Sequence, residues 1–199
     1  MDVPESFPAD VVFLIDSSSD VILDNFEMEK AFVKSVAQFM KADQNGTRVA
    51  VVTYGYIARE QTSFISPQDE FLSGLDGAQY VGGRRRIDLA ATKAAEILDG
   101  SRFLVPKVVV FLTAGVNGVG EEDLLRNGSE ALREVGASTY VVAIGGDVDL
   151  NELEMIVTKQ GDIFEVPAFT ALAETFESTA KAIIRSAGQF CFVLLSLTQ

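Results

Sequence analysis

The chain has 199 residues, of which 48% are hydrophobic and 23% are charged, a composition typical of a globular domain and not of a disordered chain. Sixteen basic and 29 acidic side chains give a formal net charge of −13, which repels phosphate backbones and argues against nucleic acid as a partner. Histidine is absent, so catalytic triads that depend on it are excluded.

Strand and helix patterns alternate along the chain. Residues 10–15 are a short apolar run rich in β-branched and aromatic side chains, and a polar turn follows them. Residues 25–40 carry apolar side chains at three- and four-residue steps, the spacing of an amphipathic helix. From these two patterns we expect strands at 10–15, 48–54, 61–65, 107–113, 138–144 and 162–166, and helices at 25–40, 69–75, 87–98, 121–134, 150–158 and 169–185.

This alternation predicts an α/β fold: a doubly wound, mostly parallel six-stranded sheet flanked by helices on both faces. Residues 107–113 form the most continuous apolar strand, so we expect them in the middle of the sheet, covered on both sides. Residues 61–65 are more polar. We therefore expect them to form an antiparallel strand at one edge.

We interpret residues 1–9 as a linker, residues 10–187 as a single domain and residues 188–199 as a tail of uncertain role. The acidic start of the chain lacks the features of a targeting segment. The apolar stretch at 190–197 is far shorter than the roughly 20 residues that span a bilayer, so we expect no membrane insertion. Cys191 is the single cysteine, and an unpaired thiol without a function is favoured over an intermolecular disulfide.

Polar residues follow the first strand at the point where a doubly wound sheet binds its ligands. Asp16, Ser18 and Asp20 stand there at alternate positions and offer the hard oxygen ligands that Mg²⁺ or Ca²⁺ requires. The alternative is a polar turn that caps the next helix. These three residues alone leave both interpretations open.

Four segments together resemble a von Willebrand factor A domain. They are VVFLIDSSSD at 11–20, GGRRRIDLA at 82–90, VVVFLTAG at 108–115 and TYVVAIGG at 139–146. Within that family the chain is most similar to the amino-terminal A domains of the collagen VI alpha-3 chain. The resemblance implies the family's Rossmann-like fold over about residues 10–185, and a secreted, non-enzymatic binding and assembly module of the extracellular matrix.

The resemblance also implies a metal-ion-dependent adhesion site, which this chain carries only in part. The family uses Asp-x-Ser-x-Ser after the first strand, a Thr in a Gly-Gly-x-Thr loop and an Asp in a Thr-Asp-Gly turn. Asp16 and Ser18 match this pattern. The other three positions hold Asp20, Arg85 and Ala114, so we interpret the site as degenerate and expect no bound metal.

Arg85 is the departure that argues most directly against a metal. A guanidinium is effectively always protonated, and the resemblance places it where the family has a neutral metal ligand. We hypothesise that Arg85, or its neighbour Arg84 or Arg86, replaces the cation with an internal ion pair to Asp16. Residual metal binding is one alternative, and a solvated Arg85 beside an empty crevice is another.

Two tripeptides fit the N-glycosylation acceptor pattern, one beginning at Asn45 and the other at Asn127. Each is expected at the surface, near a helix end or in a turn, and each is equally well explained as a neutral turn. The glycine pairs at 82–83 and 145–146 lack the spacing of phosphate-binding loops, so we predict no cofactor and no catalytic or cofactor-binding residue.

The partners that the resemblance implies are neighbouring A domains and other extracellular matrix proteins, with the isolated domain monomeric. Two rival functions stay open at this point. One is a metal-dependent adhesion domain that binds a partner's carboxylate through Mg²⁺. The other is a nucleotide-binding enzyme, because the doubly wound fold by itself does not fix a function.

Overall fold

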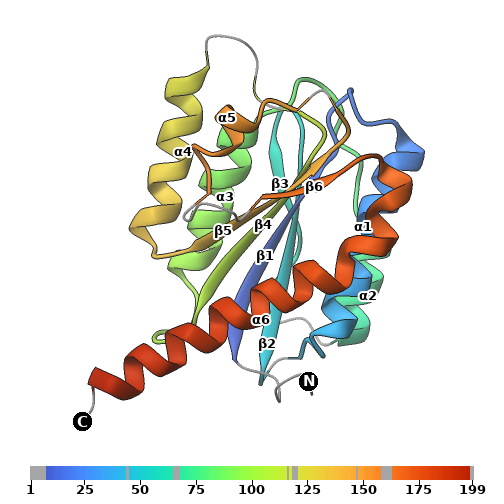
Figure 1. Cartoon of the computed structure of the whole chain (residues 1–199). Helices are drawn as coiled ribbons and strands as arrows, with labels where there is room; N and C mark the ends of the chain where they lie inside the picture. Colours follow the sequence, from blue (N-terminus) through green and yellow to red (C-terminus); the bar gives the residue numbers. More distant parts are fainter. Residues whose placement is uncertain are drawn as a thin grey trace.

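The computed structural model describes residues 8–43, 45–64, 68–115, 117, 121–146, 148–157 and 163–197, and for Gln68 and residues 186–197 it describes the backbone alone. Six strands form one sheet, with helices on both of its faces (Figure 1). The strands are β1 (Ala9–Asp16), β2 (Thr47–Tyr54), β3 (Ala58–Thr62), β4 (Lys107–Thr113), β5 (Ser138–Ile144) and β6 (Ile163–Val166). The helices are α1 (Leu23–Phe39), α2 (Gln68–Asp76), α3 (Ile87–Asp99), α4 (Glu122–Glu134), α5 (Leu150–Leu153) and α6 (Leu172–Leu197), and a 3₁₀ turn at Phe169–Ala171 precedes α6.

The strand order is β3-β2-β1-β4-β5-β6, and every neighbouring pair is parallel except β2 with β3. The mostly parallel six-stranded sheet with one antiparallel edge is therefore confirmed. β1 and β4 are its two central strands, and all eight residues of β1 are buried. Their uninterrupted apolar sequences follow from this position, because a central parallel strand meets a helix layer on each face.

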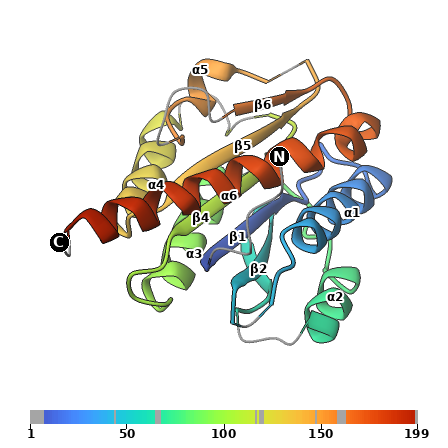
Figure 2. The same cartoon turned by 60° about the horizontal axis from the view of Figure 1, so that its bottom comes forward.

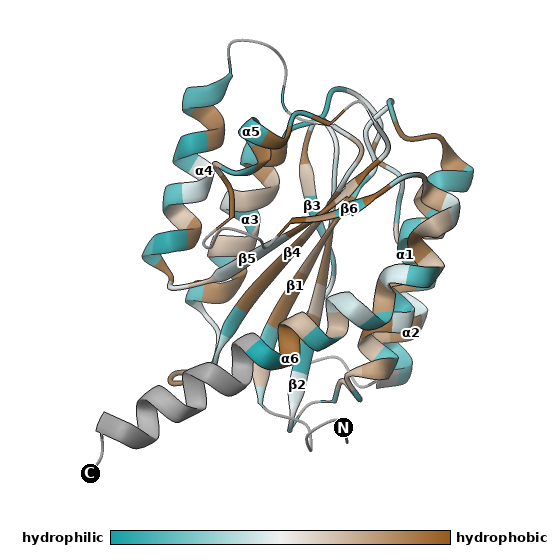
Figure 3. Cartoon of the chain, viewed as in Figure 1, coloured by the Kyte–Doolittle hydropathy of each residue, from teal (hydrophilic) through white to brown (hydrophobic). Residues whose placement is uncertain are grey.

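Two helix layers enclose the sheet, with α1, α2 and α6 on one face and α3, α4 and α5 on the other (Figures 1 and 2). Successive side chains of a strand point to opposite faces, so β1 contributes to two separate cores. Phe13 and Ile15 pack in the core with α1 and α6, and Leu14 packs with α3. In Figure 3 the hydrophobic colour runs along the central strands and along the inner sides of the helices.

The largest errors in the predicted boundaries concern one strand and two helices, α5 and α6. β3 spans 58–62 and not 61–65, because a tight turn at 55–57 places Ala58 opposite Tyr54 in the antiparallel register. Phe64, which falls inside the predicted range, lies outside β3 and packs into the core that includes α3. The predicted helix at 150–158 is a single turn, α5.

The helix predicted to end at residue 185 continues to Leu197, so the backbone of the predicted tail is helical up to that residue. Ala9, the last residue of the predicted linker, begins β1, and residues 1–7 lie outside the described residues. The domain limits at 10 and 187 stay a prediction. Among the described residues, no helix combines the length and the apolar character needed to cross a membrane.

Candidate functional site

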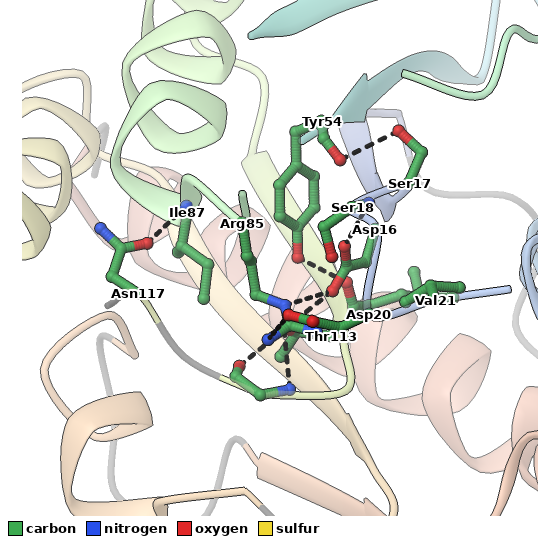
Figure 4. Close-up of polar contacts among 12 residues, drawn as sticks. Asp16, Ser17, Ser18, Asp20, Val21, Tyr54, Arg85, Ile87, Thr113 and Asn117 are labelled. Carbon is green, nitrogen blue, oxygen red and sulfur yellow. Dashed lines mark hydrogen bonds and ion pairs between the residues drawn. The ribbon is translucent and has the colours of Figure 1, made fainter. Parts of the chain in front are cut away.

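The candidate site lies at the carboxyl edge of the sheet, around the end of β1 (Figure 4). Asp16, the last residue of β1, is fully buried. Its Oδ1 accepts a 2.9 Å hydrogen bond from the backbone N–H of Ser18. Its Oδ2 accepts a 2.6 Å hydrogen bond from Nε of Arg85, and the Thr113 hydroxyl oxygen lies 3.5 Å from the same atom. A buried carboxylate is thus neutralised by a guanidinium that comes from a separate loop.

We call this cluster of buried groups around Asp16 the crevice. Arg85 reaches into it with only 7% of its surface exposed. Besides its bond to Asp16, it lies with Nη1 3.3 Å from Oδ2 of Asp20, and its Nη2 has no hydrogen-bond partner among the described residues. Burial by itself would lower the pKa of Arg85, but the charge of Asp16, the charges of Tyr54 and Asp20 and the hydrogen bond to Asp16 together outweigh burial and raise it above its ordinary value. Arg85 is therefore a permanent cation of the site.

Gly115 makes room for this guanidinium. A Cβ atom at position 115 would collide with Nη1 of Arg85 and lie 3.1 Å from its Cζ, well inside van der Waals contact. Thr113, two residues earlier, holds the backbone there, because its hydroxyl donates to the Gly115 carbonyl at 2.7 Å. The loop after β4 is thus shaped to accept Arg85.

Helix α1 supplies a second buried acid, Glu29, whose Oε2 accepts the backbone N–H of Asp16 at 2.9 Å. Burial, and then the charge of Asp16, raise the pKa of Glu29 well above its usual range, which favours its neutral form. The neighbouring Tyr54 donates its hydroxyl to the Leu112 carbonyl at 2.8 Å, and burial raises its pKa as well. Both side chains support the crevice without adding a second negative charge to it.

The other two arginines of the run at 84–86 do not enter the crevice. Arg84 pairs with Glu121, and Arg86 pairs with Asp88 through two hydrogen bonds of 2.8 and 2.5 Å. Asn117 joins the loop after β4 to α3, because its Nδ2 donates to Asp88 at 2.9 Å and its Oδ1 accepts the Ile87 N–H at 2.7 Å. Of the three candidate arginines, the structure places only Arg85 against Asp16.

The structure brings together four of the five predicted site positions. Asp16, Ser18 and Arg85 are buried together and Asp20 lies at the mouth with its side chain 70% exposed. Ala114 instead packs against the core on the α1 side. The hydroxyl of Ser18 has no hydrogen-bond partner among the described residues. Within that same part of the chain, acidic and cysteine side chains form no group of three or more suited to hold a metal ion.

Sequence reasoning missed Glu29, Thr113 and Asn117. Glu29 left a signal, because it falls three residues after Phe26 and four before Val33, on the apolar face of α1. A charged residue at such a position is buried and needs a partner. The hydrogen bonds of Thr113 and Asn117 depend on loop geometry that no sequence spacing reveals.

Both predicted glycosylation residues are exposed. Asn45 lies in the turn before β2, as expected, with its N–H bonded to Asp43 at 2.7 Å. Asn127 lies within helix α4 and not at a helix end or in a turn. The residues after it are buried, and the Ser129 hydroxyl donates to the Met155 carbonyl at 2.7 Å. The structure describes the backbone of Cys191 alone, within α6.

Comparison with known proteins gives one family. Residues 10–178 match the von Willebrand factor type A domain. The human von Willebrand factor A domain-containing protein 2 is 34% identical over 68% of this chain and 18% of its own length. The mouse collagen alpha-6(VI) chain is 29% identical over 92% of this chain and 8% of its own length, which supports the predicted similarity to collagen VI but not the choice of the alpha-3 chain. The chain thus spans less than a fifth of either relative.

Among solved structures, proximal thread matrix protein 1 from the mussel byssus superposes with a TM-score of 0.81 and 24% identity, over 90% of this chain and 47% of that one. At this identity the likeness shows the fold. The same mussel protein has also been solved with zinc in its metal-ion-dependent adhesion site (MIDAS) motif.

Proposed function

The chain belongs to the von Willebrand factor type A domain family, and on that premise we propose that it is a non-enzymatic binding and assembly module of the extracellular matrix. In this module Arg85 takes the place of the metal ion at the adhesion site. Neighbouring A domains and other matrix proteins are its partners, as the likeness to a collagen VI chain suggests. The chain is secreted, and the isolated domain is a monomer.

One observation carries this proposal: Nε of Arg85 lies 2.6 Å from Oδ2 of Asp16. A divalent cation at the same carboxylate would meet a guanidinium at contact distance, and both would be in a buried crevice where charge repulsion is weakly screened. Mg²⁺ also requires near-ideal octahedral oxygen coordination. With Arg85 and Ala114 at two of the five positions, the residues present do not fit the metal.

The charges of the crevice support the same proposal. The carboxylates near Arg85 are Asp16, which it bonds directly, and Asp20, which it approaches at 3.3 Å. Glu29 adds no full negative charge while it stays protonated. One permanent cation therefore already serves the buried carboxylate, and a divalent ion would add charge that the site does not need.

The metal-dependent alternative has a specific observation in its favour, since the mussel protein of the same fold has been solved with zinc in its MIDAS motif. For this chain to act in that way, Asp16 would have to release Arg85. That would leave a buried guanidinium with only the exposed Asp20 as a partner, which is costly. The enzyme alternative has no comparable support, because Asp16 is paired with Arg85, and Glu29, whose pKa burial raises, is fully buried and bonded to the Asp16 N–H.

Calorimetric titration with Mg²⁺ and Mn²⁺ tests the proposal, together with thermal unfolding in EDTA. We expect no binding heat, and the same melting temperature with and without EDTA. As a functional test, binding to neighbouring A domains of the full-length protein should proceed equally in EDTA and in Mg²⁺. Saturable Mg²⁺ binding, or partner binding that EDTA abolishes, would refute the proposed role of Arg85.

A further inference from the structure

Hydrophobic side chains gather around the mouth of the Asp16 crevice. Across the described residues, eight large hydrophobic side chains are exposed, and four of them belong to the three loops around this mouth or, for Leu23, to the first position of α1. We call these four side chains the rim: Ile22 (61% exposed), Leu23 (59%), Tyr56 (57%) and Tyr80 (38%). The segment that leads into α1, which includes the first two, is hydrophobic in Figure 3. Exposed apolar side chains gathered around a polar centre are typical of a protein-binding surface.

The loops that carry the rim are joined to one another by hydrogen bonds. The Ser19 N–H donates to the Gly83 carbonyl, and the Gly83 N–H donates back to the Ser19 hydroxyl, both at 2.8 Å. The Tyr56 N–H donates to the Gly82 carbonyl at 3.1 Å. The Tyr80 hydroxyl donates to the Val21 carbonyl at 2.6 Å. The rim is thus held in place before a partner arrives, which lowers the entropic cost of binding.

Gly83 brings Tyr56 into the rim. Its backbone has φ of +74°, and a Cβ there would lie 2.7 Å from Cδ1 of Tyr56. Because residue 83 has no side chain, the Tyr56 ring lies directly against this loop. Gly83 also bonds Ser19, the residue before Asp20 in the chain. Tyr56 and the segment that carries Asp20 are therefore both bonded to the loop at 82–83.

The exposed charge at the centre of the rim is negative. The Asp20 side chain is 70% exposed, whereas the Arg85 side chain behind it is 8% exposed and already bonded to Asp16. The contact between Arg85 and Asp20, at 3.3 Å, is the longer of the two ion pairs, so Asp20 keeps most of its surface for a partner. Two exposed arginines lie near the rim, and both have partners: Arg84 pairs with Glu121, and Arg59 donates to the Gln79 side chain. The net charge of −13 has the same sign as this centre.

We infer that the rim binds a protein segment that presents a lysine or arginine between apolar side chains, with the cation on Asp20 and the apolar groups on Ile22, Leu23 and Tyr56. This inference rests on the proposed function, because only a crevice filled by Arg85 leaves a carboxylate as the exposed charge. A site that held a divalent metal would select the opposite charge, a partner's carboxylate. The replacement of the metal by arginine thereby reverses the charge that the edge selects.

A peptide selection tests this inference and requires no purified partner. Phage-displayed random peptides are selected on the folded wild-type domain in EDTA, after removal of phage that bind a Leu23→Ser variant. We expect enriched peptides that place Lys or Arg among apolar residues. Synthetic copies are then titrated by calorimetry, and we expect Asp20→Asn and Leu23→Ser each to weaken binding about tenfold.

Two matched controls leave the rim intact. Asp24→Asn removes another exposed carboxylate, in the first turn of α1, and Phe103→Ser removes an 88% exposed aromatic outside the rim loops. Both controls should bind the peptides as the wild type does. The absence of enriched peptides, enrichment of acidic ones, or unchanged binding by Asp20→Asn would overturn the inference and leave the proposed function intact. A parallel selection in Mg²⁺ that enriched peptides whose binding EDTA abolishes would instead count against the proposed function.

Discussion

Removal of the Arg85 side chain is the sharpest test of the crevice. In Arg85→Ala, the fully buried Asp16 carboxylate keeps the Ser18 N–H at 2.9 Å and the distant Thr113 hydroxyl at 3.5 Å, but loses its cation. Loss of one partner of a buried ion pair costs about 3 to 5 kcal/mol. The melting temperature of a domain of this size falls by about 2 to 4 °C for each kcal/mol of stability lost, so we expect it to fall by about 6 to 20 °C in this variant.

Two further variants separate charge from packing. Arg85→Met keeps most of the aliphatic volume, so a similar loss there would assign the effect to charge. In the double variant Arg85→Met/Asp16→Asn neither residue is charged, and replacing both partners of a buried ion pair often leaves the stability almost unchanged. We therefore expect the double variant to be more stable than the sum of the two single changes predicts, by about 1 to 3 kcal/mol.

The assay is thermal unfolding of each variant with and without EDTA, monitored by circular dichroism and calorimetry. EDTA should leave the wild-type curve unchanged. The reasoning about Arg85 fails if Arg85→Ala melts with its parent, or if EDTA lowers the melting temperature of the wild type. Additive effects of the two single substitutions would also show that the pair is not coupled.

Three more predictions concern the same crevice. The pKa of Glu29 is raised above its usual 4.5 in the folded state, so as pH rises above about 4.5 the unfolded state loses this proton first and the folded state is progressively destabilised. In a pH series of unfolding curves, Glu29→Gln should therefore have a higher melting temperature than the wild type at neutral pH, and the same melting temperature as the wild type below about pH 4. Ala114→Asp alone should give no Mg²⁺ heat in calorimetry, because Arg85 still lies on Asp16 and position 114 packs against the core on the α1 side; tight binding by this variant would contradict the reasoning. Gly115→Ala should displace the Arg85 guanidinium and lower the melting temperature by about 2 to 12 °C, and the same loss in an Arg85→Met background would show that the two residues do not compete for one space.

The sheet was predictable because its physical cause is local and repeated along the chain. β4 and β5 were placed to the residue, since a strand buried on both faces requires an unbroken apolar run. β3 was displaced because an edge strand has no such requirement, and its register follows from the turn at 55–57. The end predicted for α6 at residue 185 was wrong, because no capping or helix-breaking residue stands at that position and the helix continues to Leu197.

The site was predictable only where the family pattern names a position. The pattern identified Asp16 and Arg85, but three consecutive arginines offered no way to tell which one enters the crevice. That choice depends on Asp88 and Glu121, which take Arg86 and Arg84 away from it. These partners lie on α3 and just before α4, and their positions follow from tertiary packing and not from spacing along the chain.

A tethered cation and a bound ion differ in what they allow a site to do. A bound metal keeps open positions that a partner's oxygen can fill. Arg85 directs its shortest bond to Asp16, its Nη1 to Asp20, and leaves less than a tenth of its side chain exposed. The positive charge is thus neutralised inside the protein, and the surface that remains is the Asp20 carboxylate among exposed apolar groups. Because this charge does not depend on dissolved ions, binding at this edge should respond to salt through screening of Asp20 and not to chelators.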